Sequence, residues 1–339
     1  MKAYELIPGS GLAGLHMVER ASAPLGPGDV RVRIRAVSLN YRDLLLARTG
    51  QRGLGGDGAG RSVIPVSDGA GEVIAIGAEV RDLAIGDRVA ASFFPGWRDG
   101  ARTPATDLRV LGGDLDGVLA EEVVLPAPAW VRVSPHLSFE EAATLPCAGV
   151  TAYTAVFGGV TPPPGGCIVV QGTGGVSVLA LQLARAAGLT VIATSKSAAK
   201  AERMRELGAA RVIDYAADPS WGAAAYAAAG GGADLIVEVG GPGTFEQSVA
   251  AARIDGAIAL VGVLTGERGD IDLSPMRRKQ LHVFGVAVGP ARTLAALDRA
   301  LARWAIRPVI DRVFAFDDAA QAFHYLASGN HVGKIVVQI

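Results

Sequence analysis

Two patterns of hydrophobic and polar positions divide the chain. In the first 125 residues the apolar runs are short, and in VRVRIRAVSL (30–39) apolar and basic side chains alternate. Such alternation predicts a strand with one buried and one solvated face. GAGEVIAIG (69–77) and GDRVAASFF (86–94) predict two more short strands bounded by glycine. The polar, turn-rich segment 95–117 predicts a loop, either a lid or a solvated connection.

From about residue 140 the pattern changes to strands that are apolar throughout, separated by helical stretches. Such strands predict a parallel sheet covered by helices on both faces. The expected strands are 167–172, 190–195, 211–215, 233–241 and 256–263, and the expected helices are 176–188, 198–209 and 244–254.

The last part of the chain predicts one further strand at 281–289 and helices at 291–304 and 316–329. Asp317 is the expected N-cap of the second helix. The final segment GKIVVQI predicts a strand that returns to the first part of the chain.

Composition narrows the choice of partners and compartment. The 339 residues carry a formal net charge of -1, which gives no electrostatic reason to expect nucleic acid or an anionic membrane as partner. Charges, glycine or proline interrupt every apolar run before the ~18 residues that a membrane-spanning helix needs. The N-terminus lacks the apolar region of a signal peptide, and two cysteines fit a reducing compartment. We therefore expect a cytoplasmic protein that acts on a small molecule.

A glycine-rich turn, Gly172-Thr173-Gly174-Gly175-Val176-Ser177, lies between an expected strand and an expected helix. Gly172 permits a tight turn, and Gly174 and Gly175 have no Cβ that would block a pyrophosphate. The helix that starts near Val176 offers free N–H groups and its positive dipole end. A third glycine would be expected at Ser177. The alternative is a plain glycine-rich turn, but the continuing alternation of strands and helices favours dinucleotide binding.

Several stretches, in this order, resemble the medium-chain dehydrogenase/reductase superfamily over essentially the whole chain. They include VRVRIRAVSLNYRDLLLARTG, IPVSDGAGEVIAIGAEVRDLAIGDRVA, ATLPCAGVTAYTAVF, VQGTGGVSVLALQLARAAGLTVIATS and VGKIVVQI. The resemblance implies an α/β protein of two domains. A GroES-like catalytic domain, a partly open β-barrel, would comprise residues 1–125 and 289–339, and a Rossmann domain with a doubly wound parallel sheet would comprise 126–288.

Many members of this superfamily hold a catalytic zinc, and the resemblance places its ligand positions on Asn40, Ser67 and Cys147. Asn40 and Ser67 are poor zinc ligands, and such a site needs about three good ones. Segment 95–117 also contains no cysteine for the family's structural zinc. We therefore expect no bound zinc, with Cys147 as a buried free thiol.

Without zinc, the chain resembles the branch of quinone oxidoreductases, enone reductases and enoyl-thioester reductases. Asn-Tyr-Arg-Asp at 40–43 is similar to their Asn-Phe-x-Asp motif. The resemblance suggests that Asn40 donates a hydrogen bond to a substrate oxygen and that Tyr41 donates a proton or lines the pocket, with core packing as the alternative for Tyr41. Arg42 and Asp43 are expected to form structural bonds. Leu45 stands where several quinone reductases have a tyrosine, so solvent is an alternative proton donor.

Other residues are candidates for the substrate pocket. Phe93, Phe94 and Trp97 either line an apolar pocket or belong to the core. Segment 50–65 resembles the variable cleft-edge segment of the family.

The choice of nicotinamide depends on the end of the strand at 190–195. NAD enzymes place an acid there, about 20 residues past the glycine turn. Here the residues are hydroxyl-bearing or basic, which favours a 2′-phosphate and therefore NADPH over NADH. By resemblance, Lys200 and Tyr215 would also contact it. The full expected cofactor set is Thr151, Gly172, Thr173, Gly174, Gly175, Val176, Ser195, Lys196, Lys200, Tyr215, Gly240, Val263 and Lys334.

The expected function is NADPH-dependent reduction of an activated C=C bond or a quinone, without zinc. The alternatives are a metal-free alcohol or aldehyde dehydrogenase and a non-catalytic NADPH-binding protein. Residues 281–288 resemble the edge strand through which the family pairs two subunits, which predicts a homodimer. The alternative is that helix 291–304 covers this strand.

Overall fold

The computed structural model describes residues 1–53 and 61–339, and they form two compact units. The first unit comprises residues 1–150 and 288–339, and the second comprises residues 151–287. None of the helices in the described part of the chain has the length and hydrophobicity to cross a membrane.

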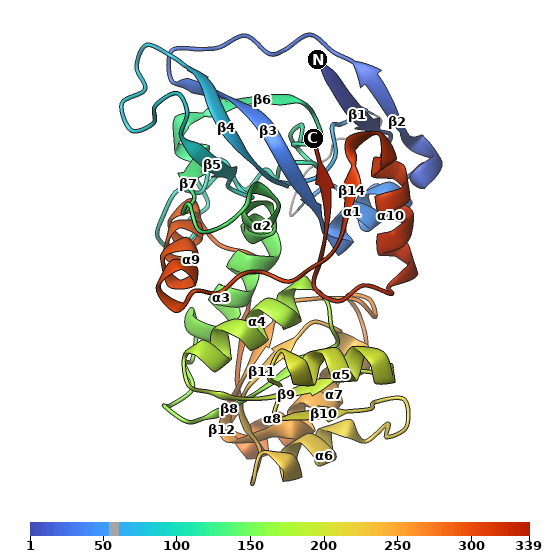
Figure 1. Cartoon of the computed structure of the whole chain (residues 1–339). Coiled ribbons are helices and arrows are strands. Elements are labelled where there is room, and N and C mark those ends of the chain that lie inside the picture. Colours follow the sequence, from blue (N-terminus) through green and yellow to red (C-terminus); the bar gives the residue numbers. More distant parts are fainter. Residues whose placement is uncertain (54–60) are drawn as a thin grey trace. The chain divides into compact units, whose positions relative to one another are not determined.

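The first unit is built on a mixed sheet to which both ends of the chain contribute. Strand β15 (Lys334–Gln338) pairs antiparallel with β3 (Asp29–Leu39), so the C-terminal strand returns to the first part of the chain as expected (Figure 1). The order within this sheet is β14 (Ile310–Ala315), β15, β3, β4 (Asp68–Ile76), β5 (Arg88–Ala91) and β7 (Trp130–Arg132), and β6 (Glu122–Pro126) also pairs with β3.

Strand β3 shows why the alternating pattern folds in this way. Val30, Val32 and Ile34 lie in the hydrophobic core, and the intervening arginines are half-buried or exposed. A separate antiparallel pair, β1 (Lys2–Leu6) and β2 (Leu15–Glu19), packs on the same core.

Helices complete the first unit. They are α1 (Tyr41–Thr49), α2 (Phe139–Ala143), the π-helix η3 (Leu145–Gly149), α9 (Ala291–Trp304), α10 (Ala319–Ser328) and the short 3-10 turns η1 (Leu12–Gly14), η2 (Ala127–Ala129) and η4 (Phe316–Asp318). The prediction of Asp317 as N-cap of α10 was wrong. Asp318 takes that position because η4 precedes the helix.

The division between the units differs from the expected boundary at residue 125. Residues 126–150 belong to the first unit. Strand β7 pairs antiparallel with β5, and α2 packs on β3 and β4. This segment therefore completes the first sheet, although its short elements gave no clear periodic pattern.

The second unit is a doubly wound parallel sheet, as expected. Its order is β10 (Arg211–Ile213), β9 (Thr190–Thr194), β8 (Cys167–Gln171), β11 (Ala233–Glu238), β12 (Ala252–Leu260) and β13 (His282–Gly285). The helices of this unit are α3 (Val150–Phe157), α4 (Gly175–Ala186), α5 (Ala198–Glu206), α6 (Trp221–Ala228), α7 (Pro242–Ala251) and α8 (Leu273–Lys279). The strand order reverses between β8 and β11, which is where such sheets bind ligands.

Candidate functional site

The two predicted catalytic residues lie at the start of α1 and differ in their exposure to solvent. Asn40 is the N-cap residue and is 9% exposed, whereas Tyr41 is 39% exposed. The Asn40 backbone N–H donates to the Asp43 carboxylate at 2.8 Å, which closes the first turn of the helix. Burial raises the pKa of Asp43 to about 6, and Arg42 opposes this rise.

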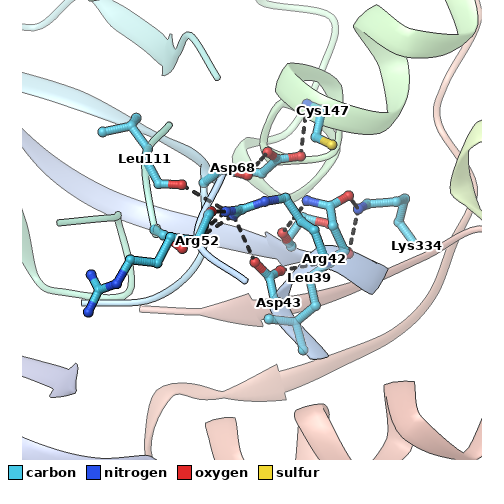
Figure 2. Close-up of polar contacts among 12 residues, drawn as sticks. Leu39, Arg42, Asp43, Arg52, Asp68, Leu111, Cys147 and Lys334 are labelled. Carbon is cyan, nitrogen blue, oxygen red and sulfur yellow. Dashed lines mark hydrogen bonds and ion pairs between the residues drawn. The ribbon is translucent and has the colours of Figure 1, made fainter. Parts of the chain in front are cut away.

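Lys334 is buried against the residues that precede α1. Its Nζ donates to the Leu39 carbonyl at 2.5 Å and to Asn40 Oδ1 at 2.6 Å (Figure 2). Burial lowers the pKa of Lys334, and the charge of Asp68 opposes the shift. The lysine therefore fixes the Asn40 amide with its oxygen toward the ammonium group. The amide nitrogen lies 3.5 Å from the Ser38 carbonyl, which is a weak contact.

Asp68 lies in the same buried polar cluster. Its carboxylate accepts from the Ser67 hydroxyl at 2.7 Å and from the Cys147 backbone N–H at 3.0 Å. Burial raises the pKa of Asp68, while Lys334, Ser67 and Asn40 lower it. Burial also raises the pKa of the Cys147 thiol, and Asp68 adds to that effect.

Arg42 holds the polar loop that follows β5. Its guanidinium donates to the carbonyls of Leu111 at 3.2 Å and Arg52 at 2.8 Å, and pairs with Asp43 at 3.3 Å (Figure 2). These contacts agree with the expectation that Arg42 and Asp43 serve a structural role.

The aromatic residues after β5 pack in a small core cluster. Phe93 is 6% exposed and Phe94 is fully buried, so core packing describes both. Trp97 is half-buried beside them. Residues 54–60 of the expected cleft-edge segment lie outside the described residues.

In the second unit, the glycine turn leaves space at the N-terminus of α4. Gly172 has φ +69°, which favours glycine, and its N–H donates to the Thr194 carbonyl at 3.0 Å. A Cβ added to Gly172 or Gly174 would meet no atom within 4 Å. The helix begins at Gly175 after the N-cap Gly174, which has no side chain, and its first turn contains no acid. This glycine-lined N-terminus fits an anionic group such as a pyrophosphate.

Ser177 explains why the third glycine can be replaced. Its side chain is 2% exposed, and its hydroxyl donates to the Gln171 carbonyl at 2.6 Å. The hydroxyl thus ties the first turn of α4 to the end of β8, and a glycine there could not make this bond.

The other expected cofactor residues in this unit mostly follow the carboxyl ends of neighbouring parallel strands. Ile213 of β10 pairs with Thr194 of β9, and the Ser195 N–H donates to the Ile213 carbonyl at 2.9 Å. Lys196 and Tyr215 therefore follow their strands at matching positions. Gly172 and Thr173 follow β8, Gly240 follows β11, and Val263 follows β12. The strand topology brings these residues to one edge of the sheet.

Comparison with known proteins decides the family. The protein-family model described as "Zinc-binding dehydrogenase" matches residues 175–303, and the model described as "Alcohol dehydrogenase GroES-like domain" matches residues 26–135. A zinc-type alcohol dehydrogenase-like protein of Schizosaccharomyces pombe is 38% identical, over 93% of this chain and 92% of its own length. The chain belongs to the medium-chain dehydrogenase/reductase superfamily. It is an oxidoreductase of this superfamily.

Other relatives indicate the range of chemistry in this superfamily. A chloroplastic quinone-oxidoreductase, QR1, of Triphysaria versicolor is 28% identical over 97% of this chain and 95% of its own length. The crystal structure of an NAD-dependent alcohol dehydrogenase matches with TM-score 0.90 and 30% identity over 100% of both chains. A crotonyl-CoA carboxylase/reductase in complex with NADP matches with TM-score 0.87 and 25% identity, over 100% of this chain and 95% of that one.

The superfamily's zinc does not fit the residues at the expected ligand positions. The Asn40 amide oxygen accepts from Lys334, and the Ser67 hydroxyl is bonded to Asp68. Across residues 1–53 and 61–339, no three His, Cys, Asp or Glu side chains are grouped to hold a metal ion.

Two of the expected cofactor residues do not lie in the loops or helix starts that follow strands β8 to β12. Thr151 lies in α3 and is 4% exposed. Lys334 belongs to the first unit, where it holds Asn40. Their assignment to the cofactor remains a prediction. Sequence reasoning missed Gln171 and Glu238, two buried polar residues that each end a strand directly after a run of apolar residues. A polar residue at that position was the available signal.

Proposed function

We propose that this protein reduces an activated C=C bond or a quinone with hydride from NADPH, without zinc. The observation that carries the proposal is the sheet edge of the second unit, where a glycine turn leads into a helix with a glycine N-cap and hydroxyl and lysine residues follow β9. The NADP complex of the crotonyl-CoA carboxylase/reductase and the similarity to QR1 support it.

The proposed chemistry assigns separate roles to Asn40 and Tyr41. NADPH, when bound, supplies the hydride that adds to an electron-poor carbon of the substrate. The Asn40 amide nitrogen also bonds to Asp68, so it would donate to the substrate oxygen, on which negative charge develops, through the N–H that now makes the long contact to Ser38. Lys334 holds the amide in the orientation that this requires. Tyr41, which is partly exposed, is the proposed proton donor, with water as the alternative.

A substrate panel tests the reaction. Purified protein with NADPH is offered quinones, 2-alkenals and enoyl thioesters, and with NADP⁺ it is offered simple alcohols. We expect oxidation of NADPH by at least one member of the first group. The similarity to an NAD-dependent alcohol dehydrogenase favours metal-free alcohol or aldehyde oxidation as the second candidate. Fast alcohol turnover without enone or quinone turnover would establish that second candidate instead.

The preference for NADPH is proposed from the residues after β9 and β10. Lys196 is exposed, Ser195 lies beside the N-cap of α5, and Tyr215 is 37% exposed at the matching end of β10. Lys200 lies in the first turn of α5. An ammonium group near a phosphate contributes roughly 1.5–3 kcal/mol, so two such contacts give a preference on the order of a hundredfold or more.

The variant Lys200→Ala tests this preference. We expect the unmodified protein to bind NADPH at least tenfold more tightly than NADH, and the substitution to reduce that ratio mainly by weakening NADPH. Titration of cofactor fluorescence measures both dissociation constants. Arg205→Ala is the matched control, since it removes a positive charge from the same helix where the guanidinium pairs with Glu202 at 2.8 Å. Equal affinities for the two cofactors in the unmodified protein would contradict the proposal.

Absence of zinc is proposed from the chemistry of the Asn40, Ser67 and Cys147 positions. Metal analysis of protein purified without a histidine tag is expected to find far less than one zinc per chain. One zinc per chain would overturn this part of the proposal.

We also propose a cytoplasmic homodimer that pairs through residues 281–288. Cys147 and Cys167 are both free thiols, which fits a reducing compartment. The exposed β13 edge supports the pairing.

A further inference from the structure

Glu238, at the end of β11, is a fully buried carboxylate that accepts several hydrogen bonds. Its Oε1 accepts from the backbone N–H groups of Gly240 at 2.6 Å and Gly241 at 2.9 Å, and from the Thr244 hydroxyl at 2.6 Å. Its Oε2 accepts from the Ser248 hydroxyl. An ionised carboxylate only accepts hydrogen bonds, so this set of donors matches its charged form.

Gln171 connects this carboxylate to the glycine turn. Its Nε2 donates to Glu238 Oε2 at 2.6 Å, and its Oε1 accepts from the Val239 N–H at 3.1 Å and the Gly240 N–H at 3.3 Å. Gln171 is the last residue of β8 and directly precedes Gly172. The two side chains therefore tie together the loops after β8 and β11, where the strand order reverses.

A third loop is fixed to the same point. The Gly240 carbonyl accepts from the backbone N–H and the hydroxyl of Thr265, both at 2.8 Å. Gly240 is thus held through its N–H and its carbonyl. A Cβ at this position would lie 2.1 Å from Thr244 Oγ1, so the arrangement requires glycine.

The helices that begin at these loops differ at their N-termini. At α7, Glu238 accepts from the N–H groups of Gly240 and of the N-cap Gly241. At α4, the N-cap is Gly174, which has no side chain, and the first turn contains no acid. Both helix ends have the positive dipole that attracts an anion. Glu238 supplies that anion internally at α7, whereas α4 has no acid of its own in this position.

We propose that Glu238 is a positioning residue for the nicotinamide cofactor. Through Gln171 it holds the Gly240 loop beside the glycine turn, and it occupies the anion-attracting N-terminus of α7. This inference rests on the proposed cofactor function and adds to it a residue that would not itself touch the cofactor. Burying a charged side chain costs free energy of folding, and an apolar side chain of similar volume often stabilises a protein equally well. A purely structural role therefore does not explain why a carboxylate lies at this position.

The variant Glu238→Gln tests the inference. Its amide group would place a donor against at least one of the present donors, so the Gly240 loop must shift. We expect the dissociation constants of NADPH and NADH to rise by similar factors of about tenfold or more, on the scale of 1.4 kcal/mol per tenfold. The variant disturbs the binding site of the pyrophosphate, which NADPH and NADH share. The ratio of their two dissociation constants therefore stays unchanged. With NADPH varied at a saturating concentration of a substrate found in the panel, KM for NADPH rises while kcat changes less than twofold.

Asp234→Asn is the matched control. Asp234 lies at the other end of the same strand, where its carboxylate accepts from the Cys167 N–H at 2.7 Å and from Arg253 Nε at 2.7 Å. This variant loses comparable bonds far from the carboxyl edge. We expect it to lose stability and to bind both cofactors within twofold of the unmodified protein.

Gln171→Met is a second variant, in case Glu238→Gln does not fold. It removes the connection between the loops and keeps the carboxylate, and it is expected to weaken both cofactors similarly. If the unmodified protein binds cofactor and the folded variants bind it equally well, the inference is overturned while the proposed function stands. An equal loss in Asp234→Asn would also overturn it, because general destabilisation would then explain the effect. If the unmodified protein binds neither cofactor, the proposed function fails and the inference fails with it.

Discussion

Ser177 replaces an expected glycine, and its buried hydroxyl makes a local bond that the turn after β8 depends on. The Ser177→Ala substitution would leave the Gln171 carbonyl without this donor, at a cost of about 1 kcal/mol, the usual net value of a buried hydrogen bond. Urea denaturation at neutral pH measures the loss. Ser328→Ala is the control, since that hydroxyl donates to the Tyr325 carbonyl at an exposed helix end. An equal effect in both variants would contradict the role assigned to Ser177.

Asp43 predicts how stability depends on pH. Burial raises its pKa from 3.8 to about 6 in the folded protein, so the folded state binds this proton more tightly than the unfolded state does. The contribution of Asp43 to stability is therefore largest below about pH 4, falls as the pH rises to 6, and is constant above that.

The variant Asp43→Asn removes this titration. We expect the free energy of unfolding of the unmodified protein, minus that of the variant, to decrease between pH 4 and pH 6 and to level off above it. Urea denaturation at several pH values gives this difference. A difference that grows over the same interval would show that the Asn40 and Arg42 bonds outweigh burial and hold the pKa low.

At the scale of elements, the hydrophobic pattern correctly identified those strands whose burial can be deduced from their own residues. The alternation in β3 and the mainly apolar runs of β8 and β11 were assigned correctly, because the pattern of apolar side chains shows directly whether one face or both faces of a strand are buried. The pattern was less informative for β14, where most residues are exposed or half-buried, and for the short strand β7. Strand β12 starts at Ala252, ahead of the expected residue 256, because it pairs with β11 from Ala233 onward.

The candidate site was predictable only where strand order determines position. Residues after β8 to β12 reach one edge in any parallel sheet, so most of the expected cofactor residues come together there. The contact of Lys334 with Asn40 joins positions 294 residues apart, and no local pattern specifies it. The Glu238 and Gln171 bonds likewise depend on β11 lying beside β8, which becomes visible only in the folded sheet.

At the scale of the whole molecule, one edge of the sheet in the second unit is a strand that pairs on one side only. Strand β13 pairs with β12 and stands at the edge of the sheet. Val283 in this strand is 38% exposed, and Leu264 and Leu273 of the preceding segment are 50% and 66% exposed. Helix α9, the alternative cover, belongs to the first unit and packs there on β7 and η3. An exposed apolar edge strand favours pairing with another copy of itself.

The variant Val283→Lys tests the proposed homodimer, because a lysine on an edge strand opposes the approach of a second strand and its mate would bring the same charge. We expect the unmodified protein to sediment as a dimer at micromolar concentration, and the variant to dissociate at least tenfold more readily. Val313→Lys is the matched control, since Val313 is 46% exposed on β14, the edge strand of the other sheet. It should leave the dimer intact. A monomeric unmodified protein would refute the proposal, and a dimer weakened equally by both lysines would place the contact elsewhere than β13.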